Sequence, residues 1–126
     1  MYLMIDTSER YKIALALFDE TVSNTVCLDA NNRELLQCID TFITKQEISK
    51  VEVQGIMVVV GEGSFTSTRL AVTVANTFAY VQQISVLAIS KEQASDPQEL
   101  ISELLEQPKG QYISATYSAL PSVNMK

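Results

Sequence analysis

The segment 55–80 constrains the fold most strongly, because an apolar run, a glycine turn and a helical pattern follow one another without interruption. Residues 56–60 are all apolar, which is typical of a central strand covered on both faces. Gly61 and Gly63 bracket a tight turn, and helical spacing extends over Phe65–Gln82. A strand, a turn and a helix in this order direct backbone N–H groups and the positive end of the helix dipole toward one point. The segment therefore predicts either an anion site or a purely architectural junction.

The rest of the chain predicts a single α/β domain with the order β-β-β-α-β-α-β-α. Apolar runs indicate strands at residues 2–5, 11–18, 21–28, 55–60 and 85–89, which we expect to form a five-stranded mixed sheet. Helical spacing covers residues 33–45, 65–82 and 96–107, and residues 111–116 offer a further strand. Crossovers between parallel strands are right-handed. The first two helices therefore share one face if the fourth and fifth strands join beside the first.

The composition excludes several classes of function. The net charge is −6 and the 9 basic residues form no block, so no direct nucleic-acid contact is expected. The absence of histidine removes the commonest metal ligand and the commonest general base near neutral pH. Cys27 and Cys38 form no C-x-x-C pair, and we expect buried free thiols rather than a zinc site.

No membrane or secretory segment is expected. Residues 70–90 carry no charge, but they include several polar side chains and a predicted helix break near Gln83. The first ten residues lack the basic lead and the long apolar core of a signal peptide. A cytoplasmic protein is therefore expected.

The second helix has an unusual composition, because no charged residue follows Arg69 until Lys91. One broad side of this helix is apolar and the remaining polar stripe is uncharged, whereas a solvent-facing helix ordinarily carries Glu and Lys. The pattern predicts that the helix is covered on two sides. The outer cover is either a partner protein or, as the alternative, the first helix or the tail of the same chain.

Two segments resemble a known family. Residues 1–18, with Asp6-Thr7-Ser8, resemble the N-terminal hairpin of the actin-like ATPase superfamily. Residues 61–80, with Gly-Glu-Gly-Ser-Phe-Thr and Arg69, resemble the Gly-Pro-Gly-Ser-Phe-Thr-Gly-x-Arg motif and following helix of TsaB, also called YeaZ. Glu62 and Ser67 depart from that motif, in which proline and glycine stand. The resemblance covers residues 1–92 and implies a single actin-like (ribonuclease H-like) lobe, with a helix and tail at 92–126 in place of the family's usual second lobe.

The resemblance also implies a function. TsaB-like proteins pair with the homologous threonylcarbamoyl transferase TsaD through their first two helices, and the ATPase TsaE joins the assembly. This implies a non-catalytic scaffold without a cofactor in the formation of tRNA N6-threonylcarbamoyladenosine (t6A). A homodimer through the same face, or a degraded paralogue, is the alternative. The interface implied on the two helices comprises Leu36, Ile39, Ile43, Leu70, Thr73, Val74, Asn76, Thr77 and Tyr80.

A stand-alone phosphate or nucleotide site is the competing interpretation. Its candidate residues follow the first and fourth strands: Asp6, Thr7, Ser8, Gly61, Gly63 and Ser64. The simpler interpretation is that Asp6 caps a hairpin turn and that Ser64 caps the second helix. Glu62 favours the simpler interpretation, because its negative charge opposes anion binding.

Overall fold

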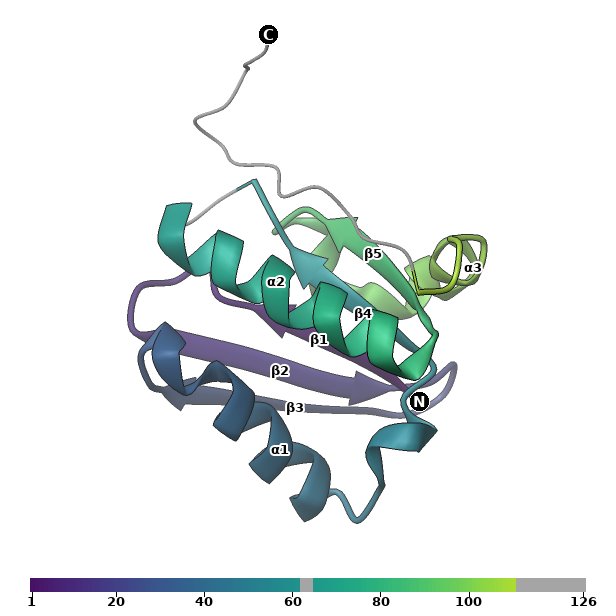
Figure 1. Ribbon diagram of the computed structural model, residues 1–126, viewed down its shortest axis with the longest axis horizontal. Coiled ribbons are helices and arrows are strands. Elements are labelled where there is room, and N and C mark those ends of the chain that lie inside the picture. Colours follow the sequence, from purple (N-terminus) through teal and green to yellow (C-terminus); the bar gives the residue numbers. More distant parts are fainter. Residues whose placement is uncertain (62–64, 111–126) are drawn as a thin grey trace, which may run out of the picture.

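The computed structural model describes residues 1–61 and 65–110, in which five strands form one mixed sheet of order β3-β2-β1-β4-β5 (Figure 1). The strands are β1 (Tyr2–Asp6), β2 (Lys12–Phe18), β3 (Ser23–Asp29), β4 (Gly55–Val59) and β5 (Ser85–Ile89). The helices are α1 (Leu35–Lys45), α2 (Phe65–Gln82) and α3 (Ile101–Leu105), with short 3-10 turns before α1, β4 and α3. The α/β fold class and the predicted order of elements are confirmed.

The first three strands form the predicted antiparallel meander. Tyr11 has a left-handed φ of 59°, so β2 begins one residue later than the apolar pattern suggests. The turn between β2 and β3 is held by Asp19, whose carboxylate accepts hydrogen bonds from the backbone N–H groups of Thr21 and Val22 at 2.9 and 2.8 Å. Such side-chain caps are a usual way to stabilise a short polar turn.

β3 is an edge strand, and most of its side chains are exposed. The expectation of two buried thiols is therefore wrong. Cys27 on β3 is exposed, Cys38 on α1 is only partly buried, and both are free. A strand that is paired on one side only leaves side chains in solvent unless another element covers it.

The parallel part of the sheet comprises β1, β4 and β5. Every residue of β4 is buried, as its continuous apolar run predicts. α1 and α2 both lie on one face of the sheet (Figure 1), which is the arrangement expected from right-handed crossovers. The core beneath them includes Leu3, Ile5, Leu15, Ile39, Ile56, Val58 and Ala75.

The opposite face carries a second core, in which α3 and the turns before it pack over β4 and β5. Gly55 permits this close approach, because a Cβ at that position would lie 2.6 Å from the Leu104 Cδ2 atom. The helix predicted from Asp96 begins as 3-10 turns and is α-helical only in α3. Residues 92–110 contain helical turns and no strand, and the strand predicted at 111–116 lies outside the described residues. Replacement of a second lobe by residues 92–126 stays a prediction.

No helix in the described part of the chain is long and apolar enough to cross a bilayer.

Candidate functional sites

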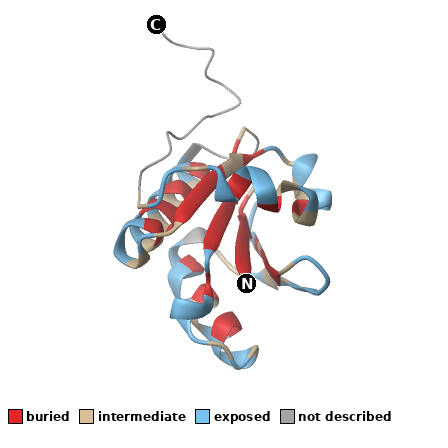
Figure 2. Ribbon diagram, turned by 90° about the vertical axis from the view of Figure 1, so that its right-hand side faces the viewer, coloured by how far each residue is buried: buried red, intermediate tan, exposed pale blue. Residues whose placement is uncertain are grey.

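α2 buries its smallest side chains and turns larger apolar ones outward. Ala71, Ala75 and Ala79 are fully buried, so the helix backbone lies close to the sheet. The partly or largely exposed apolar side chains of the same helix are Leu70, Val74, Phe78 and Val81. Figure 2 shows the same division, with buried residues facing the sheet and exposed residues on the outer sides of the helices. After Arg69, the outer face of α2 thus combines apolar side chains with uncharged polar ones such as Thr73 and Thr77.

A groove of about 400 Å³ opens between α1 and α2. Leu36 of α1, which is 57% exposed, forms one wall, and Lys50 lies at the turn before β4. The other wall is α2, which contributes Thr73, Val74, Thr77, Phe78, Val81 and Gln82. The lining is mainly apolar, and its volume falls in the range of known binding clefts. The groove is therefore a candidate site for a ligand or a partner.

The predicted interface residues divide into two groups. Leu36, Thr73, Val74 and Thr77 line the groove, while Leu70 and Tyr80 lie at other partly or largely exposed positions of α2. The remaining three are buried within the lobe, with exposed fractions of 0% for Ile39, 2% for Ile43 and 9% for Asn76. These three residues belong to the interior of the lobe. The exposed part of the predicted interface is therefore smaller than the set of residues implied by the sequence. Spacing alone does not show which side of a nearly uncharged helix faces the sheet.

The phosphate candidates that can be placed lie together at the carboxyl ends of β1 and β4. These two strands are parallel neighbours, so Asp6 at the end of β1 and Thr7 and Ser8 after it lie at the same sheet edge as Gly61, which follows β4. The Thr7 hydroxyl also donates a hydrogen bond to the carbonyl of Ser67, in the first turn of α2, at 3.3 Å. Gly61 has a φ of 90°, a left-handed conformation that glycine adopts without strain. Gly63 and Ser64 lie outside the described residues.

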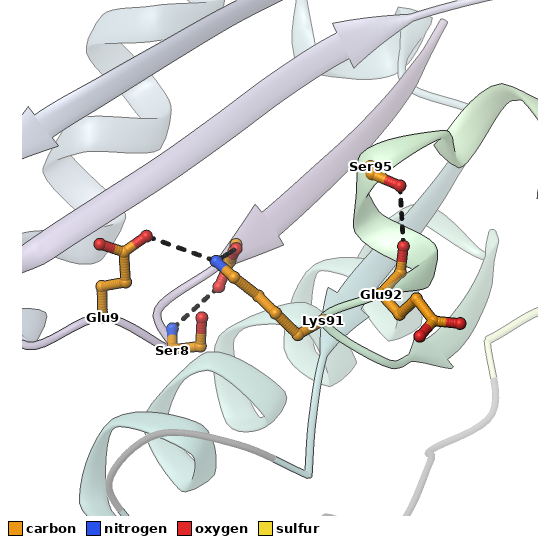
Figure 3. Close-up of polar contacts among 6 residues, drawn as sticks. Ser8, Glu9, Lys91, Glu92 and Ser95 are labelled. Carbon is orange, nitrogen blue, oxygen red and sulfur yellow. Dashed lines mark hydrogen bonds and ion pairs between the residues drawn. The ribbon is translucent and has the colours of Figure 1, made fainter.

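Asp6 forms an internal ion pair with Lys91. The Lys91 ammonium lies 2.6 Å from Asp6 Oδ2 and 3.5 Å from Glu9 Oε2, and the Ser8 N–H donates to Asp6 Oδ1 at 2.9 Å (Figure 3). The Asp6 side chain is only 7% exposed. Burial disfavours its ionisation, but the hydrogen bonds from Lys91 and Ser8 outweigh that effect and hold the pKa of Asp6 below its ordinary value. Within the described residues, no group of three His, Cys, Asp or Glu side chains is arranged to hold a metal ion.

Comparison with known proteins identifies the family. Residues 25–124, most of the chain, match the family model described as TsaD, tRNA N6-adenosine threonylcarbamoyltransferase. The chain belongs to the TsaD family. Among curated proteins, none matches it.

Comparison with solved structures shows which proteins share the fold of this TsaD-family chain. YeaZ from Pseudomonas aeruginosa matches with a TM-score of 0.65 and 23% identity, over 76% of this chain and 50% of that one. An uncharacterised protein with similarity to peptidase YeaZ from Pseudomonas aeruginosa matches with a TM-score of 0.66 and 26% identity, over 82% and 49%. The resemblance to YeaZ, and with it the actin-like fold, is confirmed. The chain spans about half the length of these structures.

Sequence reasoning missed two residues that define the sites of this TsaD-family chain. Val81, which the helical spacing places on the broad apolar side of α2, is 66% exposed and lines the groove. The sequence shows Lys91 as the first charge after Arg69 and as a candidate base for Ser64 and Ser67, but not as the partner that neutralises Asp6. A signal for its role was present, because Lys91 follows β5 and Asp6 ends β1, two parallel strands of the predicted sheet. Their carboxyl ends lie at the same edge.

Proposed function

We propose that this chain is a non-catalytic partner of a TsaD-like threonylcarbamoyl transferase and supports t6A formation in tRNA. The observation that carries the proposal is the apolar groove between α1 and α2. It lies on the two helices through which the resemblance implies pairing, in a chain that belongs to the TsaD family.

The physical argument begins with the exposed side chains. Leu36 and Val81 are 57% and 66% exposed at the groove. Leaving them in water forgoes the transfer free energy that burial would contribute, on the order of 1.5–3 kcal/mol for each fully buried side chain. A partner helix placed in the groove would bury both residues together with Val74 and Phe78. A few large apolar side chains at the centre of an interface commonly supply most of its affinity.

The charge pattern supports a protein partner. The charged residue in the groove lining is Lys50, at its edge, where its ammonium lies 2.6 Å from a carboxylate oxygen of Asp40. An apolar centre with charge confined to the rim is the usual composition of a protein–protein interface. The proposal extends to recruitment of a TsaE-like ATPase to the same assembly, on the family resemblance alone.

The proposal is tested by titration calorimetry with the cognate transferase. We expect a tight complex with the unaltered chain and at least 100-fold weaker binding with Val81→Glu, because a carboxylate would be buried in an apolar contact without a partner. Val74→Glu should have the same effect. Thr41→Glu is the matched control, because Thr41 is exposed on α1 and does not line the groove. Circular dichroism verifies that each variant is folded.

Equal affinity for Val81→Glu and Thr41→Glu would remove the groove from the interface. A second outcome concerns the alternative occupant, another copy of this chain. If the chain sediments as a dimer that Val81→Glu dissociates, and the transferase does not bind, the homodimer replaces the scaffold. A final measurement reconstitutes t6A formation with and without the chain. Formation that the chain does not stimulate would contradict the proposed role in the pathway.

A further inference from the structure

The carboxyl end of the parallel strands contains an ion pair that spans the sheet. Asp6 is the last residue of β1, and Lys91 follows β5. β4 lies between these strands, so the side chains of Asp6 and Lys91 reach across its end. In Figure 3 the Lys91 side chain extends from its loop toward Glu9 and Ser8, which lie on the hairpin side of the site. The contact therefore connects residues far apart in the chain at the position predicted for phosphate.

Both oxygens of the Asp6 carboxylate are already engaged. Oδ1 accepts the Ser8 N–H at 2.9 Å, and Oδ2 accepts from the Lys91 ammonium at 2.6 Å. A carboxylate that is 7% exposed needs such a compensating charge, since an isolated buried charge is very costly. In a site for a metal-bound phosphate, the compensating charge would come from the metal ion, which is commonly held by one or two carboxylates and by phosphate oxygens. Here the chain supplies it.

The free space on the β2 and β3 side of Asp6 is small. Asp6, Glu9, Lys12 and Lys91 line a cavity of about 10 Å³ there, together with Ala14 and Cys27. That volume is roughly what one water molecule requires. With the Lys91 side chain in place, this cavity is too small for a hydrated metal ion.

We propose that Lys91 is a built-in cation that takes the place of a metal ion at Asp6. The proposal does not depend on the role in t6A formation, because Lys91 and the groove between α1 and α2 share no residue. It makes Asp6 a structural anchor, and it predicts that a metal site is latent beneath the lysine.

The experiment measures Mn²⁺ binding by electron paramagnetic resonance and Mg²⁺–ATP binding by calorimetry. We expect weak binding of both by the unaltered chain. Lys91→Ala and Lys91→Met should bind Mn²⁺ at least tenfold more tightly, because Asp6 and Glu9 then lack their cation. Lys12→Ala is the matched control, since Lys12 lines the same space but its ammonium pairs with Asp29 at 2.7 Å. Adding Asp6→Asn to Lys91→Met should abolish the gain.

Two results would overturn the proposal. The first is binding of Mn²⁺ or Mg²⁺–ATP by the unaltered chain as tight as that of the Lys91 variants. The second is a folded Lys91→Met protein with no gain in Mn²⁺ affinity over Lys12→Ala. Lys91→Met keeps most of the aliphatic stem, so it serves if Lys91→Ala does not fold. Tight binding of Mn²⁺ by the unaltered chain contradicts the proposal even if neither variant folds, because Lys91 would then not exclude the metal from Asp6.

Discussion

The groove between α1 and α2 and the carboxyl end of the parallel strands differ in how their side chains are satisfied. At the strand ends, Asp6 has the Lys91 ammonium and the Ser8 N–H as partners within the same chain. In the groove, large apolar side chains such as Leu36 and Val81 remain more than half exposed. The polar groups of one site find partners within the lobe, whereas the apolar side chains of the other remain in solvent. The difference supports the groove as the surface for the proposed partner, and the sequence already favoured an architectural role for the strand ends.

The first prediction compares truncation of one side chain below the groove with truncation of one side chain that lines it. We expect Ile39→Ala to lower the free energy of unfolding by about 2–5 kcal/mol, because it opens a cavity in a fully buried position of α1. Leu36→Ala on the same helix should change it by less than about 0.5 kcal/mol, as is usual for exposed positions. Urea denaturation measures both values. A comparable loss for Leu36→Ala would mean that the groove is part of the lobe's own stability.

The second prediction concerns the close approach of α2 to the sheet. Ala75 is fully buried, so Ala75→Leu should destabilise the lobe by about 1–3 kcal/mol through overpacking. Val81→Ser, on the exposed side of the helix, should leave the stability nearly unchanged. Thermal unfolding by circular dichroism compares the two. If Ala75→Leu is tolerated without loss, the small residues are not what sets the distance between α2 and the sheet.

The same residues explain how far sequence reasoning reached. The apolar runs of β4 and β5 predicted their strands and their burial, and right-handed crossovers placed α1 and α2 on one face, because these rules depend on backbone geometry alone. The orientation of α2 was less predictable. Alanine, valine and leucine all count as apolar in a helical pattern, yet the structure buries Ala75 and exposes Val81. Val72 is also buried whereas Val81 is 66% exposed, so neither apolar character nor residue type alone shows which side of this helix meets the sheet.

The sequence predicted where the candidate site at the strand ends lies, but not that Lys91 pairs with Asp6 there. Asp6 ends β1 and Gly61 follows β4, and these strands are parallel neighbours, so both residues lie at the same edge of the sheet. Lys91 is distant in sequence, and only the strand order β1-β4-β5 brings it to Asp6. A long-range ion pair of this kind depends on both topology and rotamer, which no local pattern contains.

The smallest expected effect is the pH dependence of stability, which tests the ion pair between Asp6 and Lys91. The folded-state pKa of Asp6 is held below its ordinary value of 3.8, so the contribution of its ion pair is fully present above that pH. It is lost as the pH falls from 3.8 through the lower folded pKa. Among the described residues, the titratable groups that line the space beside Asp6 are Lys91, Glu9, Lys12 and Cys27, from the β5 loop, the hairpin turn, β2 and β3.

Urea denaturation between pH 7 and pH 3, in about 0.5 M salt, measures this contribution. Salt at that concentration screens exposed pairs such as Lys12–Asp29, whose side chains are 45% and 88% exposed, and affects the buried carboxylate less. We expect Asp6→Asn to flatten the acid limb of the stability curve and Asp29→Asn to leave it in place. An unchanged limb in Asp6→Asn would show that Asp6 is not neutralised in the manner described. The strand ends and the groove between α1 and α2 would then no longer differ in whether their side chains have partners within the chain.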